Sequence, residues 1–168
     1  MTSSENRPQS HTSFQIPYPK GFLRLVMRFP ILLYRLRLGW LLGKRFILIE
    51  HRGRKSGMTR RAVIEVVDHD PQEGVYVVAA AWGAQSDWFQ NILVEPNVFV
   101  TVSAQRFPAT ARRLSEEDSE RHLRSYSVRN PLAFRQIGSW LVRESSHDTE
   151  NIIRAFVETI PFVEFAPV

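Results

Sequence analysis

From Phe46 onward, apolar and polar residues alternate in short runs, a pattern typical of an antiparallel β domain. The run FILIEH predicts a first strand, AVIEVVDH predicts its partner, and VYVVAAAW predicts a third strand after the turn DPQEG. The stretch NVFVTVSAQRFPATARRL predicts a hairpin with SAQR at its turn. These runs together predict an antiparallel sheet of five or six strands that closes into a small barrel.

Helical patterns interrupt and follow the predicted sheet. The segment SDWFQNILVEP predicts a short helix with Ser86 or Asp87 as its N-cap and a proline as its stop. Residues 115–157 are mostly helical in pattern and begin with a capping box in which Ser115 and Asp118 are in register. The predicted fold class is therefore α+β, with one helix before the barrel, one inserted helix and two or three C-terminal helices.

The N-terminal helix is predicted by GFLRLVMRFPILLYRLRLGWLLGKR, the most apolar stretch of the chain. Arg24, Arg28 and Arg35 fall on one helical stripe within it, and so many charges make it a poor bilayer span. Pro30 is expected to kink or divide the helix. Two interpretations stay open: a cap on the barrel, or an amphipathic segment, residues 22–42, that lies on an anionic membrane surface.

The domain organisation follows from composition. Residues 1–13 are polar and lack the apolar core of a signal peptide, so they predict a disordered leader. Residues 14–168 suit one domain, because hydrophobic residues make up 43% of the chain. The sequence has no cysteine, and its histidines lack the spacing of metal ligands. We therefore expect a single cytoplasmic domain, peripheral to the membrane if the N-terminal helix binds there, without a metal.

The loop HRGRKSGMTRR, directly after the first predicted strand, has the chemistry of an anion site. Gly53 and Gly57 permit tight turns that expose backbone amides. The charged and hydroxyl side chains of this loop are Arg54, Lys55, Ser56 and Arg60. A net charge of +5 also favours anionic partners. A solvated turn and a non-enzymatic nucleic-acid-binding module are the alternatives, but the loop lacks the interleaved aromatics that stack on bases, so no nucleic acid is expected.

Two ordered motifs, RGRKSGMTRR and then GAQSDWFQNILVEPNVFVTV, resemble the deazaflavin-dependent nitroreductase family of F420-linked oxidoreductases. The resemblance is close from Phe46 to Leu114 and looser elsewhere. It implies an FMN-binding-like split β-barrel, formed by a single domain over residues 14–168 with a C-terminal helical extension. It also implies coenzyme F420 as the cofactor, with an FMN-dependent split-barrel reductase as the alternative.

The resemblance assigns cofactor-binding roles to particular residues. The residues that match the family's phosphate-gripping loop are Arg54, Lys55, Ser56, Gly57 and Arg60. Trp88 and Asn91 match its W-x-x-N helix, beside which the deazaflavin lies, and Ala79, Ala80 and Ala81 match the strand end that lines the ring. Small side chains there would admit a flat ring, although a crowded core that needs small residues would explain them nearly as well.

The implied reaction is hydride transfer from the reduced deazaflavin to a small, conjugated, hydrophobic acceptor such as a quinone or nitroaromatic. A polar group would then stabilise the developing negative charge, and Ser86 and Tyr126 are the candidate catalytic residues. Many relatives have a histidine-containing, Gly- and Pro-rich segment before W-x-x-N, where this chain has WGAQSDWFQN. The acceptor is therefore not carried over, and a homodimer is one expectation for the oligomeric state.

Overall fold

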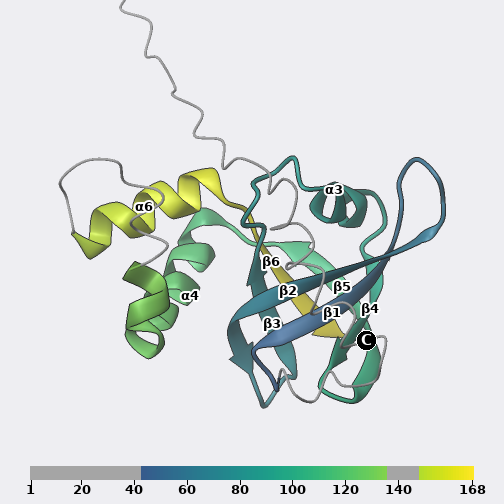
Figure 1. Ribbon diagram of the computed structural model, residues 1–168, viewed down its shortest axis with the longest axis horizontal. Coiled ribbons are helices and arrows are strands. Elements are labelled where there is room, and N and C mark those ends of the chain that lie inside the picture. The colour runs from purple at the N-terminus through teal and green to yellow at the C-terminus, as the bar shows by residue number, and fades with distance from the viewer. Residues whose placement is uncertain (1–42, 136–147) are drawn as a thin grey trace, which may run out of the picture.

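The computed structural model describes residues 43–135 and 148–168, and Figure 1 shows a barrel with helices beside it. Six antiparallel strands close the barrel in the order β1-β2-β3-β6-β5-β4. Their bounds are β1 Phe46–Arg52, β2 Thr59–Asp70, β3 Val75–Ala79, β4 Asn97–Val102, β5 Gln105–Arg113 and β6 Phe162–Pro167. The predicted antiparallel barrel and its α+β class are confirmed.

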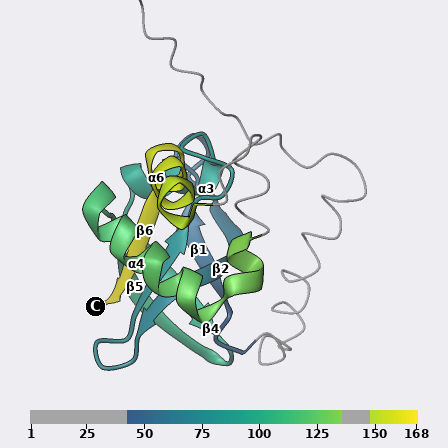
Figure 2. The same cartoon turned by 90° about the vertical axis from the view of Figure 1, so that its left-hand side faces the viewer.

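Helices α3, α4 and α6 accompany the barrel, and residues 131–135 are also helical. Helix α3 (Asp87–Val94) is inserted between β3 and β4, as predicted, whereas α4 (Glu116–Arg129) and α6 (Thr149–Thr159) lie between β5 and β6. Helices α4 and α6 pack together beside the barrel (Figure 2), and Figure 1 shows them on the opposite side of it from α3. The predicted leader and N-terminal helix lie outside the described residues.

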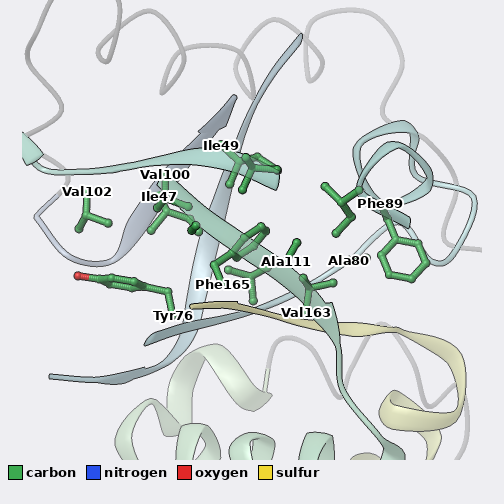
Figure 3. Packing of buried hydrophobic residues seen from close by; sticks show 14 residues of the cluster. Ile47, Ile49, Tyr76, Ala80, Phe89, Val100, Val102, Ala111, Val163 and Phe165 are labelled. Atoms are coloured by element: carbon green, nitrogen blue, oxygen red, sulfur yellow. The ribbon is translucent and has the colours of Figure 1, made fainter. Parts of the chain in front are cut away.

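The barrel is held together by the inward-facing side chains of its strands. Ile47 and Ile49 of β1 are fully buried, and the cross-strand pair Ile49–Val100 connects β1 to β4. Figure 3 shows such side chains converging from several strands, with Phe89 of α3 packed against one end. The apolar positions of the predicted strands therefore face the barrel core, as the alternating pattern predicted.

The sixth strand, β6, was not located by the sequence pattern. It pairs with β3 on one side and β5 on the other, so it closes the barrel. The third strand is also shorter than predicted, because it ends at Ala79 and does not continue to Trp82. The chain turns there, where the Gly83 N–H donates to the Ala80 carbonyl at 2.6 Å.

The start of α4 departs slightly from the predicted capping box. Ser115 is the N-cap, and its hydroxyl accepts from the Asp118 N–H at 3.1 Å, as expected. The Asp118 carboxylate, however, accepts from the Ser115 hydroxyl at 2.9 Å instead of from its backbone. Aspartate has a shorter side chain than the glutamate more usual at this position, which accounts for the difference.

Candidate cofactor-binding site

A pocket of about 600 Å³ brings the two predicted motifs together. The predicted residues that line it are Arg54, Lys55, Ser56, Arg60, Ser86, Trp88 and Asn91. Further lining residues, not predicted, are His51, Gly53, Arg61, Ala62, Trp82 and Asp87. The β1–β2 loop and the beginning of α3 thus form one concave site, of the size usual for small ligands.

The β1–β2 loop is tightly folded by its own backbone. The Gly57 N–H donates to the Gly53 carbonyl at 2.8 Å, and the Gly53 N–H donates to the Met58 carbonyl at 2.9 Å. A Cβ on Gly53 would lie 2.9 Å from the Ser56 hydroxyl, while Gly57 has a φ of +63°. Position 57 therefore favours glycine because its φ is positive, whereas a side chain at Gly53 would have to displace the Ser56 hydroxyl. Gly57 shapes the loop without lining the pocket.

Asn91 fastens this loop to α3. Its side-chain oxygen accepts from the Arg54 N–H at 3.0 Å and from the Arg54 guanidinium at 2.9 Å. Its amide nitrogen faces Nδ1 of His51 at 3.2 Å. The Arg54 guanidinium also bonds the Asp87 carboxylate at 3.0 Å. The asparagine of the W-x-x-N motif is therefore buried beneath the loop and engaged with protein groups.

The basic side chains of the pocket differ in what they already bind. Arg61 pairs with Glu50 at 2.7 Å, and Arg54 pairs with Asp87. In the part of the chain that the structure describes, Lys55 and Arg60 have no ion-pair partner. These two cations are therefore the ones whose charge is available to an anionic ligand.

Glu50 keeps Arg61 occupied. Burial raises the pKa of the Glu50 carboxyl, but hydrogen bonds from Arg106 and Arg61 outweigh burial and hold it below its ordinary value. The carboxylate bonds Arg61 through one oxygen and Arg106 through the other, each at 2.7 Å. Glu50 is thus ionised at neutral pH and neutralises much of the Arg61 charge.

Ser86 lines the pocket, but its hydroxyl is engaged by a hydrogen bond within the protein. It is buried at the N-cap of α3, yet its side chain makes no capping bond. Its hydroxyl instead donates to the Gly83 carbonyl at 2.8 Å and fixes the turn before the helix. The predicted helix N-cap at Ser86 is correct in position and wrong in its hydrogen bond.

The three alanines and Tyr126 are not among the residues that line the pocket. Ala80 is fully buried in the barrel core, and its N–H donates to the Pro161 carbonyl at 2.9 Å, which favours the crowded-core interpretation. Tyr126 is buried between α4 and the barrel and donates to Glu65 at 3.3 Å. Burial, with the nearby Glu65 charge, raises the pKa of Tyr126 to about 12. The structure thus brings neither Ala79–Ala81 nor Tyr126 to the site.

His51 was overlooked in the sequence, although the signal was present. It is the first letter of HRGRKSGMTRR and continues the inward series of Ile47 and Ile49 along β1. A histidine at an inward position beside a basic loop points to the base of that loop. Trp82, which the sequence pattern predicts as the end of the third strand, instead lies beyond β3 and lines the pocket. Within the described residues, no cluster of histidine and carboxylate groups could hold a metal.

A closed antiparallel barrel with a basic, aromatic-lined pocket beside it places the chain in the class of split-barrel proteins that the two motifs predicted. Residues 35–144 match the family model of the F420H(2)-dependent quinone reductases, and the chain belongs to this family. It is therefore an oxidoreductase with coenzyme F420 as its cofactor, as the motifs predicted, and the non-enzymatic alternative is set aside. No curated protein matches the chain.

Solved structures agree with this barrel. An F420-H2 dependent reductase, FDR-A, is 20% identical with a TM-score of 0.50, over 73% of this chain and 95% of its own. A structure described as a domain-swapped dimer is 19% identical with a TM-score of 0.50, over 81% and 98%. An FMN-binding protein related to pyridoxamine 5'-phosphate oxidase, from Nostoc punctiforme, is 12% identical with a TM-score of 0.50, over 83% and 78%. At these identities the likeness supports the split-barrel fold alone.

The pocket fits a cofactor that carries both a phosphate and a flat ring. Lys55 and Arg60 offer charge and the Ser56 hydroxyl offers a hydrogen bond, while the Trp82 and Trp88 side chains offer aromatic surface. Trp88 is held edge-on against Phe89, with ring centroids 6.0 Å apart. This donor set suits an anionic aromatic ligand and has nothing that requires a metal.

Proposed function

We propose that the protein transfers a hydride from reduced coenzyme F420 to a conjugated hydrophobic acceptor such as a quinone or a nitroaromatic. The observation that carries the proposal is the pocket in which the unpaired cations Lys55 and Arg60 stand with Trp88, in a chain of the F420H(2)-dependent family. The cofactor supplies the hydride, and reduction of a quinone to a hydroquinone takes up one further proton.

The chain's own residues divide the work of binding. Lys55 and Arg60 bind the cofactor phosphate, because neither has an ion-pair partner among the described residues. The Ser56 hydroxyl, which accepts from the Met58 N–H at 3.4 Å, keeps its proton to donate to that phosphate. Arg54 and Asn91 hold the loop in shape, which explains why these motif residues bond each other. Trp88 presents aromatic surface for the ring. Ser86, whose hydroxyl proton is given to Gly83, keeps only acceptor capacity toward the pocket.

Binding and turnover test the proposal directly. Purified protein should bind F420 more tightly than FMN or FAD in a fluorescence titration. Reduced F420 should then be oxidised on addition of a soluble naphthoquinone or a nitroaromatic, followed by recovery of the oxidised cofactor's absorbance. F420 bound without oxidation by either acceptor would refute these acceptor classes and leave cofactor binding intact.

An FMN-dependent split-barrel reductase is the second candidate. It is favoured by the fold that this chain shares with the FMN-binding protein from Nostoc punctiforme. The same phosphate-binding cations would serve FMN, so the loop does not discriminate between the two cofactors. Equal or tighter binding of FMN in the titration above would decide for this candidate.

We also propose that the protein lies at an anionic membrane, where lipid-soluble quinones reside. The segment concerned, residues 22–42, is outside the described residues, and its arginines among apolar residues support the proposal. None of the helices within residues 43–135 and 148–168 is long and apolar enough to cross a bilayer. Each basic residue near an anionic surface contributes about 1 kcal/mol, so weak, salt-sensitive binding is expected.

Liposome sedimentation measures this association. The full chain should sediment with anionic vesicles at low salt and not with neutral ones. A variant with Arg24, Arg28 and Arg35 changed to Gln should stay in the supernatant. Identical partitioning of both proteins would leave the segment as a cap on the barrel and favour a water-soluble acceptor.

A homodimer stays a prediction for this chain. It is supported by the similar structure described as a domain-swapped dimer, which covers 81% of this chain. Sedimentation velocity of the full chain measures the state directly, and a single monomeric species would exclude it.

A further inference from the structure

His51 is an ionisable group buried directly beneath the basic loop, and the binding roles proposed above do not use it. Its side chain ends the inward row of β1, and the residue is only 5% exposed. Asn91, the residue it faces, is only 4% exposed. Because both side chains expose so little area, their polar atoms depend mainly on hydrogen bonds to neighbouring protein groups.

The donors and acceptors among Arg54, Asn91 and His51 can be assigned in only one way. Both Arg54 groups at Asn91, the backbone N–H and the guanidinium, are donors and cannot accept. The Asn91 side-chain oxygen must therefore point to Arg54, which turns its amide NH₂ toward His51. Nδ1 of His51, 3.2 Å away, then has to be the acceptor, so the ring proton sits on Nε2.

We infer that His51 is a positioning residue: its unprotonated Nδ1 holds Asn91, and through Asn91 and Arg54 it holds the basic loop in the form that binds the cofactor phosphate. This inference rests on the proposed binding of F420 through that loop. Protonation of Nδ1 would place two donors face to face. Rotating the Asn91 amide would only move the conflict to Arg54, so the loop would lose its anchor.

The charges around His51 oppose its protonation overall. Arg60 is its cross-strand partner on β2, Arg54 approaches from the loop, and Arg61 also lines the pocket. On α3, Asp87 is the only acid facing it among the described residues, and its carboxylate is engaged with Arg54. Glu50, next to it in β1, is paired with Arg61 and Arg106. The setting is therefore mostly cationic.

Burial is the largest influence on the pKa of His51 and lowers it, and the charge of Arg60 adds to the lowering. A hydrogen bond with the Arg52 backbone and the charge of Asp87 act in the opposite direction, but the net pKa of His51 lies below the ordinary value. The anchored state therefore binds fewer protons than the released state. Anchoring is complete above the ordinary histidine range, around pH 6.5, and is lost as the pH falls toward the lowered value. Acidification should accordingly weaken cofactor binding, and alkaline pH should not.

Two substitutions at His51 separate its role in positioning Asn91 from any general contribution to the stability of the fold. In His51→Asn, the side-chain oxygen can take the place of Nδ1 as an acceptor and does not titrate. In His51→Leu, the side chain fills much of the same space without any acceptor. His69→Asn is the matched control, because His69 bonds the Val75 carbonyl at the far end of β2 and lies outside the pocket.

F420 affinity is measured by fluorescence titration at several pH values. At neutral pH, His51→Leu should bind about tenfold more weakly than the wild type, the effect of one lost hydrogen bond, whereas His51→Asn should match it. Below the ordinary histidine range the wild type should weaken relative to His51→Asn. Because both proteins bind the same cofactor, ionisation of the cofactor does not affect the ratio of their affinities. The His69→Asn variant should follow the wild type at every pH.

A second measurement needs no cofactor. The Arg54 N–H, which donates to Asn91, should be protected from hydrogen exchange in the wild type and in His51→Asn and be unprotected in His51→Leu. Acidification should remove the protection only where His51 is present. Equal protection in all three proteins, or parallel pH profiles, would overturn the inference. Failure of the wild type to bind F420 while this protection behaves as expected would overturn the proposed function and retain the His51 anchor.

Discussion

Changing Lys55 or Arg60 to Gln is expected to weaken F420 binding by about 1–3 kcal/mol for each residue, and the loss in the double variant should depart from the sum because both cations contact the same phosphate. The physical reason is that neither cation has an ion-pair partner in the described structure, so each gives its full charge to the phosphate. Fluorescence titration of the single and double variants measures the loss.

Arg61 and Arg113 provide the controls for charge. Arg61 lines the same pocket but is neutralised by Glu50, so Arg61→Gln should cost clearly less affinity than Lys55→Gln. Arg113 is exposed on β5 and lies outside the pocket, so Arg113→Gln should leave binding unchanged. Similar losses for Lys55, Arg61 and Arg113 would mean that only the overall net charge matters and that the loop is not the phosphate site.

The difference between Arg54 and Lys55 shows how far the sequence could define this site. The order of letters in RGRKSG predicts a phosphate-binding loop, and the structure brings that loop to the W-x-x-N helix. The sequence could not show that the Arg54 side chain turns inward to Asn91 while Lys55 has no ion-pair partner among the described residues. That division depends on how the loop and α3 approach each other, which spacing along the chain does not encode.

The predicted site residues that do not line the pocket, the alanine run and Tyr126, have local sequence patterns that fit either a functional or a structural role. A run of alanines suits close approach of a ring and also a crowded barrel, and only the packing of Ala80 in the core distinguishes them. Tyr126 has a polar end that could serve catalysis, but α4 packs on β2 and places the hydroxyl against Glu65. Long-range packing of this kind is absent from a periodicity analysis.

Most strands were predictable because one of their faces is apolar and the other polar, and β6 was missed because it lacks that contrast. Val163 and Phe165 point into the barrel core, while Phe162 points the other way, into the cluster formed by α4 and α6. With both faces covered, the run FVEFAP follows no strict alternation and reads as the tail of a helical region.

Phe165→Ala is therefore expected to cost about 3–5 kcal/mol of unfolding free energy, the range for a large aromatic removed from a core. Phe165 is fully buried on the strand that joins β3 to β5, so the cavity would open where the barrel closes. Urea denaturation with linear extrapolation measures the loss. The matched control is Phe99→Ala on β4, where the ring is 41% exposed and covered by Arg106, with an expected cost of about 1 kcal/mol. Equal losses at Phe165 and Phe99 would show that β6 contributes no more to stability than surface packing does. That result would contradict the prediction that β6 closes the barrel core.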